Sequence, residues 1–179
     1  DTARIIIGEI NDCMPRTNGA TTVPVDRVQA FVRTRRPLHE HAPSTESPIE
    51  GRIGELIADL VDDRATLQMG IGAIPDAVLR RLGHKRDLGI HTEMFSDGVI
   101  DLAEGGVITN RYKKVHPGRI VTSFINGTRR LYDFVDNNPI VELHPTEYVN
   151  DPYIIRQNDK QVAINSAIEV DLTGQVCAD

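Results

Sequence analysis

Short runs rich in β-branched residues alternate with segments of helical spacing along most of this chain, which limits the folds open to it. Strands are expected at residues 4–10, 66–69, 88–92, 107–109, 119–125, 140–143, 161–165 and 168–172, and helices at 48–61, 75–82 and 128–136. Strands that alternate with helices build parallel sheets, because each helix carries the chain back across the sheet. The pattern therefore predicts an α/β fold, an open and mainly parallel sheet with helices on both faces.

The helix expected at 48–61 has an explicit start signal. Ser47 is a favourable N-cap residue, Pro48 suits the first helical position, and Glu50 completes a capping box. Apolar residues then recur at helical spacing, so we expect them to form the buried face of this helix. They are Ile53, Leu56, Ile57, Leu60 and Val61.

A proline-containing stretch without clear periodicity divides the chain. Residues 33–48 contain Pro37, Pro43 and Pro48, which is typical of a linker. We therefore expect two parts: residues 1–47, with the last strand of an N-terminal domain and a linker, and residues 48–179, with most of a second domain. The chain lacks an initiator Met and enters a strand almost at once, so we interpret it as a piece of a longer protein.

Composition excludes several classes of protein. The net charge is −6, whereas a general nucleic-acid-binding protein has a basic surface. The two cysteines, Cys13 and Cys177, form no disulfide framework, and we expect both to be reduced thiols. No apolar run approaches the length of a membrane span, and no signal peptide is visible. We expect a cytoplasmic protein with no nucleic-acid or membrane partner.

Glu93 is the first candidate site residue. It follows the apolar run Leu88 to Ile90 and precedes a Ser96-Asp97-Gly98 turn, so it lies where a buried strand ends. Ligands in open α/β sheets bind just outside the carboxyl ends of strands. Most Glu residues are solvated, but a carboxylate in this position can also act as a general base, or attack an activated acyl group as a nucleophile.

The second candidate is the loop of Gly70, Ile71, Gly72, Ala73 and Ile74, between an expected strand and the helix that Pro75 opens. The G-x-G pair lacks the third glycine of a dinucleotide fingerprint and the Lys-Ser/Thr of a phosphate-binding P-loop. A plain tight turn is one interpretation. The other is a close backbone approach to a ligand, with free N–H groups directed at an anion or a developing oxyanion.

We expect no metal site. His91 lies two positions before Glu93 on the same strand, but no third ligand has suitable spacing. His39, Glu40 and His41 lie in the linker and are expected to be solvated. The basic groups at residues 111–114 and 129–130 are expected to be solvated too, although such groups can also contact the phosphates of a nucleotide-like ligand.

Four blocks together resemble a known family, in the right order and across essentially the whole chain. They are LQMGIGAIPDAV at 67–78, HTEMFSDGVIDL at 91–102, GTRRLYDF at 127–134 and NSAIEVDLTGQ at 165–175. The chain resembles the acetyl-CoA hydrolase/transferase family, and within it the 4-hydroxybutyrate and butyryl-CoA:acetate CoA-transferases.

The resemblance implies two similar α/β domains with the active site between them. It implies that Glu93 attacks an acyl-CoA thioester, that an acid anhydride forms, and that CoA returns to give a glutamyl-CoA thioester. Gly70, Ile71, Gly72, Ala73 and Ile74 would then contact CoA, which is a substrate, so no cofactor is expected. The second substrate would be a short-chain carboxylate such as acetate, butyrate or 4-hydroxybutyrate, and the protein would be a homo-oligomer.

Alternatives remain for both the nucleophile and the function. Glu169 also lies on an expected strand, and we assign it a structural role. The family has a further glycine-rich CoA-contacting segment beyond the point where this chain ends, so lack of turnover by the isolated chain is one expectation. An acyl-CoA hydrolase would use the same site with water as the acceptor. A sugar-phosphate isomerase rests on fold analogy alone. A non-catalytic assembly domain would leave Glu93 idle.

Overall fold

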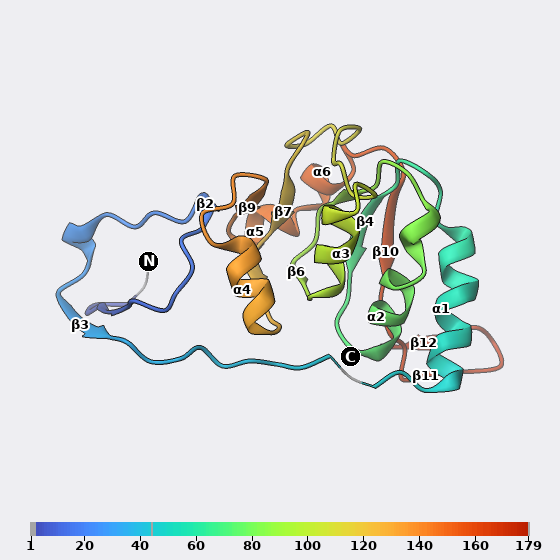
Figure 1. Cartoon of the computed structure of the whole chain (residues 1–179), viewed down its shortest axis with the longest axis horizontal. Coiled ribbons are helices and arrows are strands. Elements are labelled where there is room, and N and C mark those ends of the chain that lie inside the picture. Colours follow the sequence, from blue (N-terminus) through green and yellow to red (C-terminus); the bar gives the residue numbers. More distant parts are fainter. Residues whose placement is uncertain (1–2, 44, 179) are drawn as a thin grey trace.

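A computed structural model describes residues 3–43 and 45–178 of the chain. In Figure 1 an N-terminal segment extends from one side of an α/β body, and the chain returns along the lower edge of the body to reach α1. The segment contains a parallel pair of strands, β1 (Ile7–Asn11) and β3 (Ala30–Thr34), and a 3-10 turn at Val25–Arg27 between them.

Parallel strands form the centre of the body. β4 (Thr66–Met69) lies between β10 (Gln161–Ile164) and β5 (Gly89–Ile90). A second group, β2 (Asn18–Gly19), β9 (Val141–Leu143) and β7 (Ile120–Thr122), is also parallel. A parallel bridge between His91 and Val121 joins the two groups. The predictions of a mainly parallel sheet, and of residues 66–69 and 88–92 within it, are therefore confirmed.

Two further strand pairs extend this arrangement. β6 (Met94–Phe95) and β8 (Phe124–Ile125) pair in parallel beyond the ends of β5 and β7, so the strand broken at Thr92 and Glu93 resumes beside the same neighbour. β11 (Glu169–Val170) and β12 (Val176–Cys177) form an antiparallel pair near the C-terminus.

The described residues form six α-helices around the strands. They are α1 (Pro48–Leu60), α2 (Ala73–Leu79), α3 (Gly98–Glu104), α4 (Arg129–Val135), α5 (Thr146–Val149) and α6 (Pro152–Ile155), with a 3-10 turn at Leu82–His84. In Figure 1, α1 to α4 lie in front of the strands. Among the described residues, no helix has the length and apolar character needed to cross a membrane.

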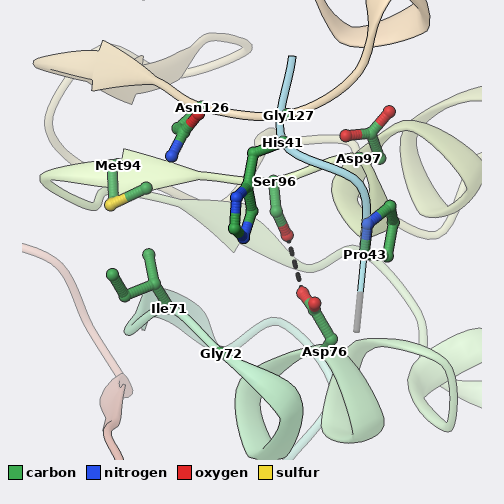
Figure 2. Close-up of a pocket in the computed structure, with 10 residues that line it drawn as sticks. All are labelled: His41, Pro43, Ile71, Gly72, Asp76, Met94, Ser96, Asp97, Asn126 and Gly127. Carbon is green, nitrogen blue, oxygen red and sulfur yellow. Dashed lines mark hydrogen bonds between the residues drawn. The ribbon is translucent and has the colours of Figure 1, made fainter. Parts of the chain in front are cut away.

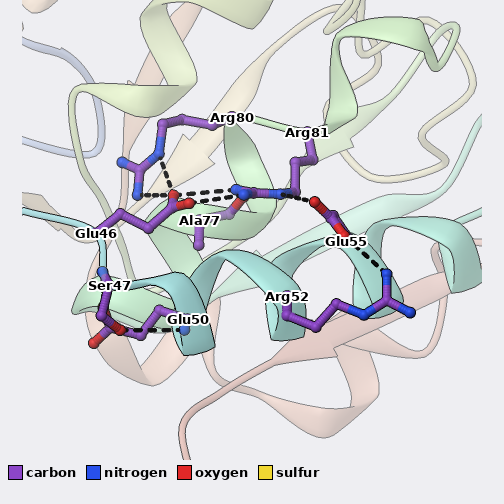
Figure 3. A network of polar contacts seen from close by, with 8 residues as sticks. All are labelled: Glu46, Ser47, Glu50, Arg52, Glu55, Ala77, Arg80 and Arg81. Atoms are coloured by element: carbon purple, nitrogen blue, oxygen red, sulfur yellow. Dashed lines mark hydrogen bonds and ion pairs between the residues drawn. The ribbon is translucent and has the colours of Figure 1, made fainter.

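The capping box forms as predicted, and an ion network lies beside it (Figure 3). The Ser47 N–H donates to Glu50 at 2.7 Å, while the Glu50 N–H donates to the Ser47 hydroxyl at 3.3 Å. Glu46 accepts hydrogen bonds from the guanidinium groups of Arg80 and Arg81 at the end of α2. The start of α1 is therefore tied to the end of α2.

The buried face of α1 differs in part from the prediction. Val61 is buried and Ile57 packs against the core, as expected, whereas Leu56 and Leu60 are exposed. The buried residues within the helix are Gly51, Gly54 and Ala58. Apolar residues at helical spacing share one face of the helix, but this spacing does not determine which face packs against a neighbouring element. Here α2 packs so closely that a Cβ on Gly54 would lie 2.8 Å from the carbonyl of Ala77. Small residues therefore face α2, because they allow the two backbones to approach.

Three other predicted boundaries need correction. The first strand begins at Ile7 and not at residue 4. β3 extends to Thr34, into the expected linker, because it pairs with β1 along its full length. The strand expected at 107–109 is reduced to one bridge between Ile108 and Leu88.

An aliphatic core holds the body together. Phe95 is its one buried aromatic residue among those described, and the cluster otherwise consists of Leu, Ile, Val, Ala and Met side chains. Members such as Leu67, Ile90 and Ile120 come from adjacent strands and are fully buried. Cys13 and Cys177 are both free, as expected.

Candidate active site

Glu93 is the last of the three residues between β5 and β6, and its main chain is held by hydrogen bonds. Its carbonyl oxygen accepts hydrogen bonds from the Ser123 N–H at 2.8 Å and the Thr122 hydroxyl at 3.0 Å. The preceding residue, Thr92, is buried and accepts from the Met69 N–H at 3.0 Å. These bonds fix Glu93 between the ends of three parallel strands, while its side chain remains partly accessible. The expected position at the strand ends is therefore the observed one.

The Glu93 carboxylate has a partner that sequence reasoning missed. Asn150, which directly follows α5, donates from Nδ2 to Glu93 Oε2 at 2.7 Å. The two residues are 57 positions apart, and no motif connects them. This amide donor holds one of the two carboxylate oxygens in place.

His91 supports the element that carries Asn150. Its Nε2 lies 2.8 Å from the carbonyl oxygen of Val149 in α5. Burial lowers the pKa of His91, so the ring is neutral at pH 7 and Nε2 carries the proton that this carbonyl accepts. His91 and Glu93 thus both contact the α5 segment, as expected for residues on one face of a strand. Their roles differ, because His91 is buried and Glu93 is accessible.

The loop of Gly70 to Ile74, called the Gly loop below, lies at the end of the neighbouring strand β4. The Gly70 N–H donates to the Ile164 carbonyl at 2.7 Å, which anchors the loop to β10. Gly72 has a φ of 104°, a conformation that favours glycine. α2 begins at Ala73, earlier than the expected Pro75, so Ala73 and Ile74 form its first turn. Gly72 and Ile71 are the exposed part of the loop.

A pocket of about 290 Å³ lies beside this loop (Figure 2). Four segments line it, namely the Gly loop, the strand end and turn after Glu93, the loop before α4, and the linker. The lining residues are Ile71, Gly72, Asp76, Met94, Ser96, Asp97, Asn126, Gly127, His41 and Pro43. Glu93 is not among them, but its neighbour Met94 is. The structure therefore places the two predicted site regions next to each other.

Polar contacts organise the walls of this pocket. The Ser96 hydroxyl donates to Asp76 in α2 at 2.8 Å, the dashed contact in Figure 2. Asp97 accepts from the Thr128 N–H at 2.9 Å. The linker takes part as well, because the His41 N–H donates to the Gly127 carbonyl at 2.9 Å. His41 is exposed, as expected, but its backbone is hydrogen-bonded to the loop before α4.

The predicted basic groups are paired within the chain. Arg129 forms an ion pair with Asp133 at 2.7 Å, and Arg130 forms one with Asp101 at 2.7 Å. Lys113 is buried at 3% exposure, contrary to the expectation of a solvated residue. Glu169, the rival nucleophile, is exposed on β11. Neither basic group is thus a ready phosphate contact.

The arrangement defines an α/β protein with a partly accessible carboxylate at the ends of parallel strands, and comparison with known proteins shows which proteins it resembles. Residues 127–179 match the family model of the acetyl-CoA hydrolase/transferase C-terminal domain. The chain is 50% identical over 179 residues to 4-hydroxybutyrate coenzyme A transferase of Clostridium kluyveri, covering 100% of this chain and 42% of that protein. The chain is therefore similar to members of the acetyl-CoA hydrolase/transferase family, the family that the sequence blocks resemble.

Two further comparisons agree. A succinyl-CoA:acetate/propanoyl-CoA:succinate CoA transferase of Fasciola hepatica is 50% identical over 175 residues, which are 97% of this chain and 37% of that protein. The crystal structure of 4-hydroxybutyrate CoA-transferase from Porphyromonas gingivalis superposes with a TM-score of 0.92 at 45% identity, covering 96% of this chain and 44% of that one. The chain therefore spans about two fifths of the length of these relatives.

Proposed function

We propose that this chain carries the nucleophile of a CoA-transferase, which moves CoA between an acyl-CoA and a short-chain carboxylate, and that Glu93 is that nucleophile. The observation that carries the proposal is the position of Glu93. Its main chain is locked between strand ends, its carboxylate is held by Asn150, and its neighbour Met94 lines a pocket together with the exposed Gly loop. The names of the relatives, all CoA transferases, support the same reaction class.

The proposed reaction has two stages. The Glu93 carboxylate attacks the thioester carbonyl, the C–S bond breaks, and an acyl-glutamyl anhydride and the CoA thiolate form. The thiolate then attacks the glutamyl carbonyl of the anhydride, which releases the first carboxylate and leaves a glutamyl-CoA thioester. An incoming carboxylate runs the same two steps in reverse and departs as the new acyl-CoA. No proton is gained or lost in any of these steps.

The chain supplies donors suited to this chemistry. Among residues 3–43 and 45–178, no acceptor is hydrogen-bonded to the N–H of Ile71 or of Gly72. Both residues are exposed and line the pocket. Free backbone donors that face a bound thioester stabilise the oxyanion that develops during attack, and one such donor is typically worth about 3–4 kcal/mol. We assign the loop to contact with the CoA thioester region on this basis.

Borohydride trapping tests the nucleophile in the intact protein. The reagent reduces a glutamyl-CoA thioester to the alcohol and releases CoA thiol. We expect activity to be lost only when acyl-CoA is present, and peptide mass analysis to place the change on Glu93. Modification of a peptide with Glu169 instead would refute the assignment of Glu93 while leaving the family intact.

A pair of variants completes the test. Glu93→Gln preserves shape and removes the charge, so we expect CoA binding to survive and exchange of labelled acetate into acetyl-CoA to fall by about 10³-fold or more. Glu169→Gln is the matched control and should exchange normally. Hydrolysis of acyl-CoA without label exchange would make the protein a hydrolase that uses the same site, and normal exchange by Glu93→Gln would rule out the covalent route.

A further inference from the structure

Three side chains that the proposed reaction does not use converge on one point. Glu142 and His144 lie two positions apart at the end of β9, so both side chains extend to the same face of the strand. His116 reaches them from the loop before β7. Its backbone has a φ of 49°, which is uncommon for a residue other than glycine. The sequence gives no sign of this meeting, because His116 is far from the other two.

The distances are close to those of a metal site. Glu142 Oε2 is 2.7 Å from His116 Nδ1 and 3.2 Å from His144 Nε2. All three ligand atoms lie within 4.8 Å of one another. A tetrahedral ion with bonds of about 2.0–2.2 Å holds its ligands roughly 3.3–3.5 Å apart. An ion would therefore require the His116 to Glu142 contact to widen by about half an ångström, while the His144 to Glu142 contact is already close to this spacing.

We propose that His116 Nδ1, Glu142 Oε2 and His144 Nε2 bind one divalent transition-metal ion of the zinc type. Two imidazoles and one carboxylate suit such ions, whereas Mg²⁺ and Ca²⁺ require oxygen ligands. The side chains of His116, Glu142 and His144 retain 26%, 22% and 14% exposure, so an ion can reach them from solvent. This site is separate from the proposed CoA chemistry and does not depend on it.

Neighbouring side chains orient two of the three ligands, His116 and Glu142, as outer-sphere partners do in metal sites. His116 Nε2 lies 2.8 Å from the Tyr148 hydroxyl, which leaves Nδ1 to face the cluster. Arg119 Nε lies 3.5 Å from Glu142 Oε1, which leaves Oε2 to face the two imidazoles. Outer partners of this kind hold a ligand in the binding orientation, and their loss costs about 10–100-fold in metal affinity.

The charges near the cluster permit a cation. Besides Arg119, the nearby cationic group is Lys113, whose Nζ donates to the carbonyls of Ile90 and Arg119 at 2.6 Å each. Burial lowers the pKa of Lys113 to about 7, although the Glu142 carboxylate opposes this shift. Its repulsion of a bound ion is therefore weaker than that of an ordinary lysine. Glu142 contributes the negative charge of the site.

Metal titration of the whole chain tests the proposal. We expect Zn²⁺ to bind with a stoichiometry of one in calorimetry, and Co²⁺ to produce the visible absorption of a tetrahedral site. A large excess of Mg²⁺ should not displace either ion. His144→Gln and His116→Asn should weaken Zn²⁺ binding by about 100-fold or more, and Tyr148→Phe by about 10–100-fold. Asn at position 116 tolerates the positive φ, so this variant keeps the backbone unstrained.

A matched control separates this site from adventitious binding. His84 is an exposed histidine outside the cluster, and His84→Gln should bind Zn²⁺ as the wild type does. Thermal unfolding without metal shows which variants are folded, and Tyr148→Phe, which removes only a hydroxyl, keeps the test available if a ligand variant unfolds. No stoichiometric Zn²⁺ binding, or equal binding by the cluster variants and the control, would overturn the proposal.

Discussion

Replacing Gly54 by Ala tests how closely α1 and α2 pack. A Cβ at this position would lie 2.8 Å from both the carbonyl carbon and the oxygen of Ala77, and 3.0 Å from its Cβ. Carbon atoms in favourable contact are about 3.5–4.0 Å apart, so the helices must separate by roughly 0.5–1 Å. The obstacle is backbone, which cannot rotate aside as a flexible side chain can.

Two opposing terms set the size of the effect. Inserting one methyl group into a closed interface costs about 1–3 kcal/mol, and a backbone obstacle favours the upper part of this range. Ala gains about 1 kcal/mol over Gly in a helix interior. We therefore expect the free energy of unfolding to fall by about 1–2 kcal/mol, and Tm by about 2–8 °C for a chain of this size.

Gly83→Ala is the matched control. Nothing lies within 4 Å of a Cβ at Gly83, and its φ is not in the left-handed region. Ala there should leave stability unchanged or raise it by about 0.4–1 kcal/mol, because it restricts the unfolded chain. Thermal unfolding followed by circular dichroism measures both variants. A Gly54→Ala chain with a Tm at or above the wild-type value would refute the close packing of α1 on α2.

Further expectations concern the site and the pH dependence. Asn150→Ala removes a charge-assisted hydrogen bond worth about 1.5–3 kcal/mol, so kcat/KM in the intact protein should fall about 10–150-fold with little change in Tm. Ile71→Asp should raise the KM for acyl-CoA, whereas Leu60→Asp, at another exposed apolar residue, should not. Equal KM values for the two variants would mean that the Gly loop is a plain turn without CoA contact. Hydrogen bonds from Arg81 and Arg80 lower the pKa of Glu46 from 4.5 to about 2, so its contribution to stability is present above pH 4.5 and is lost as the pH falls toward 2. Unfolding curves should show a smaller loss for Glu46→Gln over this interval, and parallel losses in both proteins would contradict the role of this network.

Local signals predict the parts of the fold that depend on neighbours in the chain. The capping box at Ser47 and Glu50 forms because its donors and acceptors are three residues apart and need no other element. The placement of Glu93 at a strand end follows for the same reason, since an apolar run and a turn signal bracket it. The family resemblance adds the proposed role of the Gly loop in contact with CoA, which the G-x-G spacing alone leaves open.

Contacts between distant segments were decided by the tertiary structure. Asn150 reaches Glu93 only because α5 docks beside β5, and His116 meets Glu142 and His144 only because a loop folds over the end of β9. The buried stripe of α1 was partly mispredicted for a related reason. Apolar periodicity measures the tendency of side chains to leave water, whereas the face of a helix that becomes buried depends on how closely its neighbour can approach. At Gly54 that approach is limited by backbone volume, which the pattern of Leu and Ile along α1 does not encode.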